Sequence, residues 1–147
     1  MHTGKLMVAA LLASLAFSTP SRAEDALLLS DSQRSDGASF AEQLRSSPPG
    51  RVVLLNTFLV PDGQVEAFRQ GWTKAAEVLR RKPGFVSTTL HRPVGDSRLW
   101  VNYAVWESAS DFAAALASPD FREAAAPMKQ TGFRRLYQAM PAIDPIH

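Results

Sequence analysis

Apolar residues follow two alternating spacings from residue 51 onward. RVVLLNTFLV, residues 51–60, is an unbroken apolar run of strand length, closed by the turn sequence PDG at 61–63. The next apolar residues recur at three- and four-residue steps: Val65, Phe68, Trp72, Ala75, Ala76 and Leu79. This spacing predicts an amphipathic helix that has Asp62 as its N-cap and continues to about residue 82. KPG at 82–84 ends that helix, because proline cannot continue it and glycine favours the turn after it.

The rest of the chain repeats this strand and helix alternation. FVSTTLHR (85–92) and RLWVNYAVW (98–106) predict a hairpin around the turn PVGDS. A second helix is expected from Ser108 or Ser110, with Pro119 marking a kink or a break, and FRRLYQAM (133–140) is the expected last strand. PGF at 83–85 and TGF at 131–133 stand at equivalent helix-to-strand junctions. The order predicts an α+β fold, a ferredoxin-like βαββαβ with a four-stranded antiparallel sheet and both helices on one face.

Both ends of the chain differ from this central domain, residues 51–140. Lys5 precedes an apolar run from Leu6 to Phe17, and small residues flank Arg22, so residues 1–23 are expected to be a cleaved signal peptide of a secreted or periplasmic protein. An uncleaved membrane anchor is the alternative, although the run is short for a bilayer span. Residues 24–50 are expected to be a loosely docked arm or linker, with one short helix around Phe40 and Leu44. Residues 141–147 are expected to be a tail.

Composition and charge exclude several classes of function. Two of the 16 Lys and Arg residues, Lys5 and Arg22, fall in residues 1–23 and no acidic residue does, so 14 basic side chains balance 14 acidic ones afterwards. No basic face for nucleic acid is therefore expected. The chain has no cysteine, which excludes a thiol nucleophile and a thiolate metal site. With His2 in the leader and His147 at the end of the sequence, no histidine metal cluster is expected in the domain either.

The parity of the strands predicts a partner. On the first strand Val52, Leu54, Asn56 and Phe58 share one face, and Val53, Leu55, Thr57 and Leu59 share the other. The third strand also has two mainly apolar faces, with Trp100, Asn102, Ala104 and Trp106 sharing one of them and Asn102 in the middle position that corresponds to Asn56. Two helices cover only one face of a four-stranded sheet, so the other face should be polar unless something covers it. We therefore expect a homodimer packed through this sheet face.

The residues in this order resemble the antibiotic biosynthesis monooxygenase family. The resemblance runs from NTFLVPDGQVEAFRQGW through PGFVSTTLHR to VNYAVWESASDFAAALASPDFR, and covers roughly residues 51–140. It implies a dimeric α/β barrel with a pocket between sheet and helices, where O₂ oxidises a quinol or polycyclic aromatic substrate without metal or flavin. It also implies a haem-degrading branch, whose first-strand asparagine Asn56 matches. That branch has a tryptophan and a histidine on the second helix, and residues 113–127 contain neither, so haem degradation is not expected, while haem binding stays open.

Six residues are candidates for the site. Asn56 and His91 are the catalytic candidates. Asn56 is a polar residue on the helix-facing side of its strand. His91, which alternation places on the same strand face as Phe85, Ser87 and Thr89, belongs to the residue type whose intrinsic pKa suits a base near neutral pH. Phe68, Trp72, Asn102 and Trp106 are the candidates for binding the substrate. Each also has a structural interpretation, as a core side chain for the aromatic residues and Asn102, and as a solvated strand end for His91.

Three functions therefore remain open from the sequence. The first is an exported monooxygenase that needs no cofactor and acts on an aromatic substrate with O₂. The second is a ligand-binding or accessory dimer of the same fold without turnover, and the third is a haem-binding relative. Arg92 and Arg98, which flank the hairpin turn, could attract an anionic substrate, although charges on a hairpin are usually just solvated.

Overall fold

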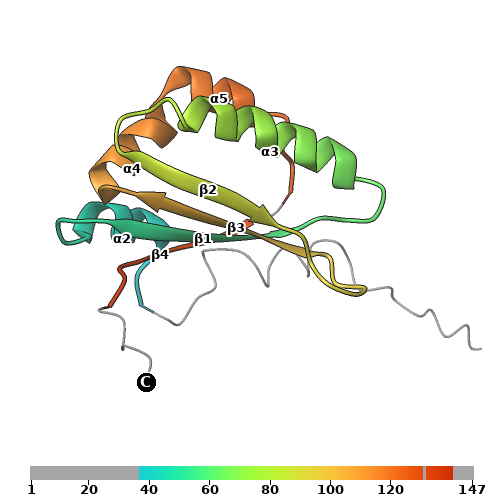
Figure 1. The fold of residues 1–147 in the computed structure, drawn as a ribbon, viewed down its shortest axis with the longest axis horizontal. Helices are drawn as coiled ribbons and strands as arrows, with labels where there is room; N and C mark the ends of the chain where they lie inside the picture. The colour runs from blue at the N-terminus through green and yellow to red at the C-terminus, as the bar shows by residue number, and fades with distance from the viewer. Residues whose placement is uncertain (1–36, 131, 141–147) are drawn as a thin grey trace, which may run out of the picture.

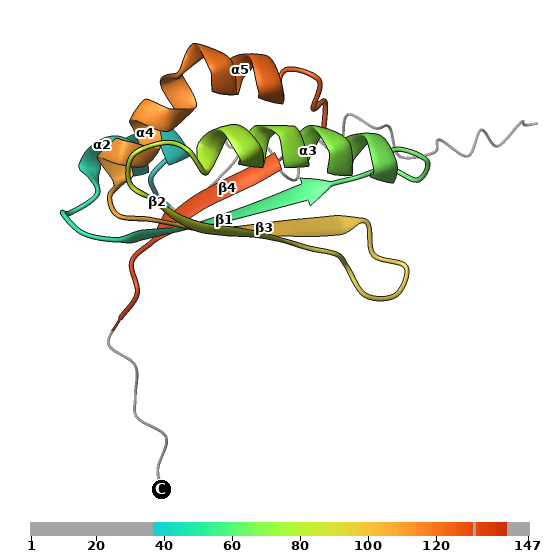
Figure 2. The same cartoon turned by 45° about the horizontal axis from the view of Figure 1, so that its top comes forward.

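The computed structural model describes residues 37–130 and 132–140, so the expected signal peptide, the part of the expected arm up to residue 36 and the expected tail at 141–147 lie outside the described residues. The elements are, in chain order, α2 (Phe40–Ser46), β1 (Val52–Leu59), α3 (Val65–Leu79), β2 (Phe85–His91), β3 (Leu99–Trp106), α4 (Ala109–Ala117), α5 (Pro119–Ala125) and β4 (Gly132–Tyr137). The four strands form one antiparallel sheet in the order β2-β3-β1-β4 (Figure 1). All four helices lie on the same side of this sheet (Figure 2). The predicted ferredoxin-like α+β fold is confirmed.

The two faces of the sheet differ as strand parity predicted. Every second residue of β1 from Val52 to Phe58 is buried, and so is every second residue of β3 from Trp100 to Trp106. These two sets face the helices, since they occupy matching positions of the β1–β3 ladder. We call this side the inner face and the opposite side, which includes Leu55 and Tyr103, the outer face.

A β-bulge in β2 interrupts the alternation of its side chains between the two faces, and this changes the face on which His91 lies. Phe85 pairs with Trp106, but the next pair is Ser87 with Val105, so Val86 is the extra residue. The extra residue shifts the alternation, so that Phe85 stays on the inner face while Ser87, Thr89 and His91 lie on the outer one. His91 pairs with Val101 there. The prediction that His91 shares its face with Phe85 is therefore wrong, because alternation was counted straight through the bulge.

The helix ends agree with the sequence in two cases and differ in a third. Ser108 caps α4, with its hydroxyl accepting from the Asp111 amide at 3.0 Å. Pro119 occupies the first turn of α5, where its missing N–H costs nothing, so α4 and α5 are two short helices. Asp62 is not the N-cap of α3, because that position belongs to Gln64, which makes no side-chain cap bond. The N-cap therefore lies two residues later than predicted, and α3 begins at Val65.

Helix α2 is the predicted short helix, yet it is part of the folded core. Phe40 is buried and meets Phe112 of α4 edge-on, with ring centroids 6.1 Å apart. The Gln43 amide donates to the Leu136 carbonyl at 3.1 Å and accepts from the Leu136 N–H at 3.0 Å. It thereby satisfies the free edge of β4, which is the last strand of the sheet. The expectation of a loosely docked arm is thus corrected for residues 40–46.

Two apolar clusters occupy the inner face. The α4 cluster consists of the buried residues Phe40, Val52, Leu54, Ala104, Trp106, Ala109, Phe112, Ala115 and Leu136. The α3 cluster consists of the buried residues Phe58, Val60, Phe68 and Trp100, with Trp72 and Leu90 packed against them. Between them lies one row of the sheet that is not apolar. No helix within residues 37–130 and 132–140 is long and apolar enough to cross a membrane.

Candidate active site

Two asparagines form the polar row between the clusters. Asn56 of β1 and Asn102 of β3 are direct partners in the ladder, and both lie on the inner face. They are only 9% and 8% exposed. Buried amides are stable only when their donors and acceptors find partners, so the bonding of each amide decides what it can offer a ligand. We call these two residues the amide pair.

Asn102 is held by a neighbouring strand. The hydroxyl of Thr88 in β2 donates to its side-chain oxygen Oδ1 at 2.7 Å. Thr88 reaches the inner face because the bulge at Val86 turns it there. With the oxygen occupied in this way, the group that Asn102 presents to a ligand is its NH₂, which is a pure donor.

Asn56 keeps an acceptor without a partner. Its Oδ1 is buried and makes no hydrogen bond. An unpaired buried acceptor costs about 1–3 kcal/mol. Gly132 of β4 lies against it, and a Cβ added to this glycine would come within 3.0 Å of the Asn56 oxygen. Two residues before Gly132, the buried Oε1 of Gln130 also has no partner, although its NH₂ donates to Gln64 at 3.3 Å. The Asn56 oxygen on the inner face and the Gln130 oxygen in the loop before β4 are thus acceptors that a donor group on a ligand could satisfy.

Aromatic rings border the amide pair on the α3 side. Phe68 of α3 lies 5.1 Å from the Phe58 ring and 5.7 Å from the Trp100 ring, measured between centroids. Phe58 and Trp100 are the ladder pair two positions along from the amide pair on β1 and β3. These rings provide an apolar surface next to a polar row, which is the composition expected of a pocket for an aromatic ligand.

A cleft of about 660 Å³ leads from this region to solvent between α3 and β2. Its lining includes Arg69 and Trp72 from α3, Thr88 and Leu90 from β2, Arg92 directly after β2, and Trp100 from β3. Thr88 is the residue that holds Asn102, so the cleft connects the surface with the immediate surroundings of the amide pair. We call it the α3–β2 cleft.

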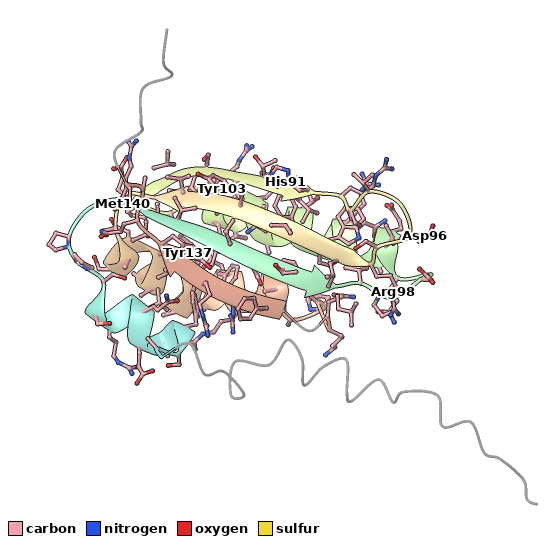
Figure 3. All side chains as sticks on the ribbon, turned by 90° about the horizontal axis from the view of Figure 1, so that it is seen from below. His91, Asp96, Arg98, Tyr103, Tyr137 and Met140 are labelled. Carbon is pink, nitrogen blue, oxygen red and sulfur yellow. The ribbon has the colours of Figure 1, made fainter. Side chains whose placement is uncertain are left out.

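The predicted site residues separate into three groups. Asn56 and Asn102 form the amide pair, and Phe68 and Trp72 lie beside it in and against the α3 cluster. Trp106 is 1% exposed and stacks on Phe112 at 5.0 Å within the α4 cluster, so its indole is a core side chain here. His91 is exposed on the outer face, on the edge strand β2 (Figure 3). The structure therefore does not bring His91 together with the amide pair.

Sequence reasoning missed Thr88, Arg69 and the position of Trp100 beside the cleft. No pattern in FVSTTLHR marks a bulge, so Thr88 could not be placed on the inner face from alternation alone. Arg69 is one of several polar residues on the predicted helix, and nothing in the sequence distinguished it from the others. The parity of β3 did place Trp100 with Asn102, and that signal could have identified it as a neighbour of the cleft.

The two carboxyl groups with lowered pKa values, Asp120 and Glu107, are not neighbours of the amide pair in the sheet. A hydrogen bond from Lys82 at 2.7 Å, with a second from Ser118, lowers the pKa of Asp120 to about 2. A hydrogen bond from Arg51 lowers the pKa of Glu107 below its usual range. Both pairs join neighbouring elements at the surface. Among the described residues there is no group of three or more His, Cys, Asp or Glu side chains that could hold a metal ion.

The sequence profile of the antibiotic biosynthesis monooxygenases matches residues 51–127, just over half of the chain. The chain belongs to this family. The resemblance drawn from the motifs is thereby confirmed, and the profile spans the elements from β1 through α5 that carry the amide pair and the α3–β2 cleft.

Two relatives of this family have informative names. Tetracenomycin-F1 monooxygenase of Streptomyces glaucescens is 37% identical over 75 residues, which are 50% of this chain and 66% of that protein. The crystal structure of SnoaB, a cofactor-independent oxygenase from Streptomyces nogalater, superimposes with a TM-score of 0.60 at 31% identity, covering 65% of this chain and 99% of SnoaB. An asparagine-to-alanine variant of SnoaB gives a TM-score of 0.59 at 30% identity, with the same coverage.

Proposed function

We propose that this antibiotic biosynthesis monooxygenase oxidises a quinol or polycyclic phenol with O₂ and without a cofactor. The observation that carries the proposal is the unpartnered, buried Oδ1 of Asn56, next to the donor amide of Asn102 and a wall of aromatic rings. A phenol has the features that match these groups, namely a flat apolar ring, one O–H donor and one oxygen that accepts. The names of the two relatives support the same reaction class.

The amide pair would orient the substrate and stabilise its charged form. The phenolic O–H donates to Oδ1 of Asn56, and the NH₂ of Asn102 donates to the substrate oxygen as negative charge develops there. The aromatic substrate itself supplies the electrons. One oxygen atom of O₂ enters at a ring C–H carbon and becomes a carbonyl oxygen, while the phenolic oxygen becomes a second carbonyl. The hydrogen of that C–H bond and the hydrogen of the phenolic O–H leave with the other oxygen atom as water. Exclusion of bulk water by the α3 cluster strengthens both hydrogen bonds.

We also propose a homodimer through the outer face. This face carries apolar and aromatic side chains on the central strands, including Leu99, which is 43% exposed, and Tyr103, which is 40% exposed. Tyr137 of β4 lies on the same face and is 50% exposed (Figure 3). A monomer in sedimentation at micromolar concentration would contradict the dimer.

Export of the protein remains part of the proposal. Its support is the sequence alone, with Lys5 before the apolar run from Leu6 to Phe17 and the small residues on either side of Arg22. Intact mass of the protein recovered from its host tests this point, since cleavage near residue 23 leaves a chain that begins near Glu24.

Turnover by Asn56→Ala tests the reaction itself. Oxygen consumption and product absorbance are followed with hydroquinones and anthrones for the wild type and for this variant. We expect kcat to fall about 10²-fold or more, because the substrate loses the acceptor that orients its O–H. The free energy of unfolding should change by about 1 kcal/mol or less, because Ala also removes an unpartnered oxygen.

The matched control is Thr57→Ala, the next residue on β1, which faces the other side of the sheet. It should leave kcat unchanged. Asn102→Ala should lower kcat as Asn56→Ala does, and in addition lower stability, since it leaves the Thr88 hydroxyl without its acceptor. Unchanged kcat in the Asn56 variant would remove the amide pair from the mechanism.

A further inference from the structure

The α3–β2 cleft has an uneven distribution of charge. Arg69 and Arg92 are the only ionisable residues in its lining, and no acidic residue lines it. Arg69 comes from α3 and Arg92 from the end of β2, so the two guanidinium groups approach the cleft from opposite walls. A cleft lined by charge of one sign attracts ligands of the opposite sign.

Arg92 stands at the junction of two clefts. A second cleft of about 470 Å³, between the β2–β3 hairpin and the start of α3, also has Val65, Arg92 and Trp100 in its lining. Asp96 and Arg98 lie at the hairpin end of the sheet (Figure 3). Arg92 is therefore placed where a ligand lying in the α3–β2 cleft would meet solvent.

Arg69 and Arg92 differ in whether they form an ion pair within the described residues. Arg69 pairs with Glu66 one turn earlier on α3, with nitrogen and oxygen 3.2 Å apart and both side chains exposed. None of the ion pairs seen in the described part of the chain involves Arg92. A planar guanidinium with unused donors is well suited to a carboxylate, which it can bind through two parallel hydrogen bonds.

The apolar part of the cleft fits a ring. Trp72 and Leu90 lie on opposite walls and are half-buried, so their apolar surfaces are available inside the cleft. A volume of about 660 Å³ lies within the range of roughly 300–1,000 Å³ that is typical of small-molecule sites. Thr88, which bonds Asn102 of the amide pair, is among the residues that line the cleft.

We propose that the α3–β2 cleft selects an anionic aromatic ligand, with a ring between Trp72 and Leu90 and a carboxylate on Arg92. This deepens the proposed function, on which it rests for the identity of the ligand as a substrate. The carboxylate at the mouth leaves the far side of the ring system directed toward the amide pair. Arg92 is a specificity-determining residue in this arrangement, and Arg69 adds a weaker attraction because Glu66 offsets it.

A matched pair of probes tests the proposal without any turnover. Anthraquinone-2-carboxylate and anthraquinone-2-carboxamide have nearly the same shape and differ in charge, and quenching of tryptophan fluorescence reports their binding. The wild type should bind the carboxylate about 10-fold or more tightly than the carboxamide, with the difference shrinking as salt is added. Arg92→Gln should abolish this preference while the affinity for the carboxamide stays the same. Arg69→Gln should reduce the preference only partly.

Arg81→Gln is the control, since Arg81 is exposed after the end of α3 and does not line the cleft. It should change neither affinity. Equal affinities of the wild type for the two probes, an equal loss of both in Arg92→Gln, or no binding of either probe at millimolar concentration would overturn the proposal. Selective binding without oxidation of any quinol would leave this site in place and refute the monooxygenase function. Turnover without preference for the carboxylate would support the monooxygenase function and refute the proposed site for an anionic ligand.

Discussion

The α4 cluster and the α3 cluster share one face of one sheet and differ in how completely they are closed. In the α4 cluster, aromatic rings touch in a chain from Phe40 through Phe112 and Trp106 to Phe85, beneath α2 and α4. In the α3 cluster, four buried residues lie under one long helix, with the half-buried Trp72 and Leu90 at its border. Both clefts described above border the α3 cluster, since Trp100 lines each of them.

Because of this difference, the α4 cluster mainly stabilises the fold, whereas the α3 cluster can also contribute to ligand binding. Close packing at the α4 cluster supplies apolar burial, which is the main favourable contribution to folding. The amide pair lies at the edge of that packed region, where its strands are held rigidly. The α3 cluster offers apolar surface that is only partly covered, which a ring could cover further. Three comparisons of matched variants follow from this, in order of expected effect.

Trp106→Ala and Trp72→Ala compare the same side chain in the two clusters. Trp106 is 1% exposed, and large-to-small changes of this kind cost about 3–5 kcal/mol. Trp72 is half-buried at the border of its cluster, so its loss should cost at most about 1–2 kcal/mol. Urea denaturation followed by circular dichroism measures both. Equal destabilisation would show that the two clusters are closed to the same degree.

Gly84→Ala and Gly95→Ala compare two glycines with left-handed backbone. Both have positive φ, +76° and +66°, where an alanine costs about 1–2 kcal/mol. A Cβ on Gly84 would also collide with the Asp111 side chain of α4, whereas a Cβ on Gly95 in the hairpin meets nothing within 4 Å. Gly84→Ala should therefore be the more destabilising by about 1–3 kcal/mol in urea denaturation. If the two variants unfold at the same urea concentration, the junction before β2 is less tightly packed than the structure indicates.

The same glycine shows why the fold could be predicted from the sequence. Gly84 follows a helical pattern and has a left-handed backbone, so the PGF motif marks a true boundary. Its counterpart Gly132 has no positive φ and instead makes room for the side chains of Asn56 and Phe58. The repeated spacing predicted both junctions correctly, although the two glycines are required for different physical reasons.

The site was predictable only as far as regular alternation holds. Parity placed Asn56 and Asn102 on the inner face, since β1 and β3 pair without interruption. It failed on β2, where one extra residue moved His91 to the outer face and Thr88 to the inner one. A bulge depends on the packing of the strand against its neighbours, and propensity carries little information about it. Packing of α2 on β4 was missed for a similar reason, because the Gln43 to Leu136 bonds join residues far apart in the chain.

The ion pair between Lys82 and Asp120 ties the end of α3 to the start of α5, and it gives the smallest effect. Both carboxylate oxygens of Asp120 lie 2.7 Å from the Lys82 nitrogen, which with the Ser118 hydroxyl lowers the pKa of Asp120 to about 2. By contrast, the pair of Arg69 with Glu66 joins residues within one helix. The Lys82–Asp120 pair therefore links two elements. The Arg69–Glu66 pair joins residues that α3 already places close together, so it should contribute less to stability.

Asp120→Asn should be less stable than the wild type near neutral pH, and this difference in stability should disappear as the pH is lowered. A carboxyl group with a lowered pKa stabilises the folded state above its unfolded pKa, near 3.8, and this contribution is lost as the pH falls toward 2. The urea midpoints of the two proteins should thus differ at pH 6 and converge between pH 4 and pH 2. Glu66→Gln, measured in parallel, should shift the midpoint less at every pH. A difference for Asp120→Asn that stays constant down to pH 2 would mean that the asparagine changes packing at the start of α5, and that the charge of Asp120 contributes nothing.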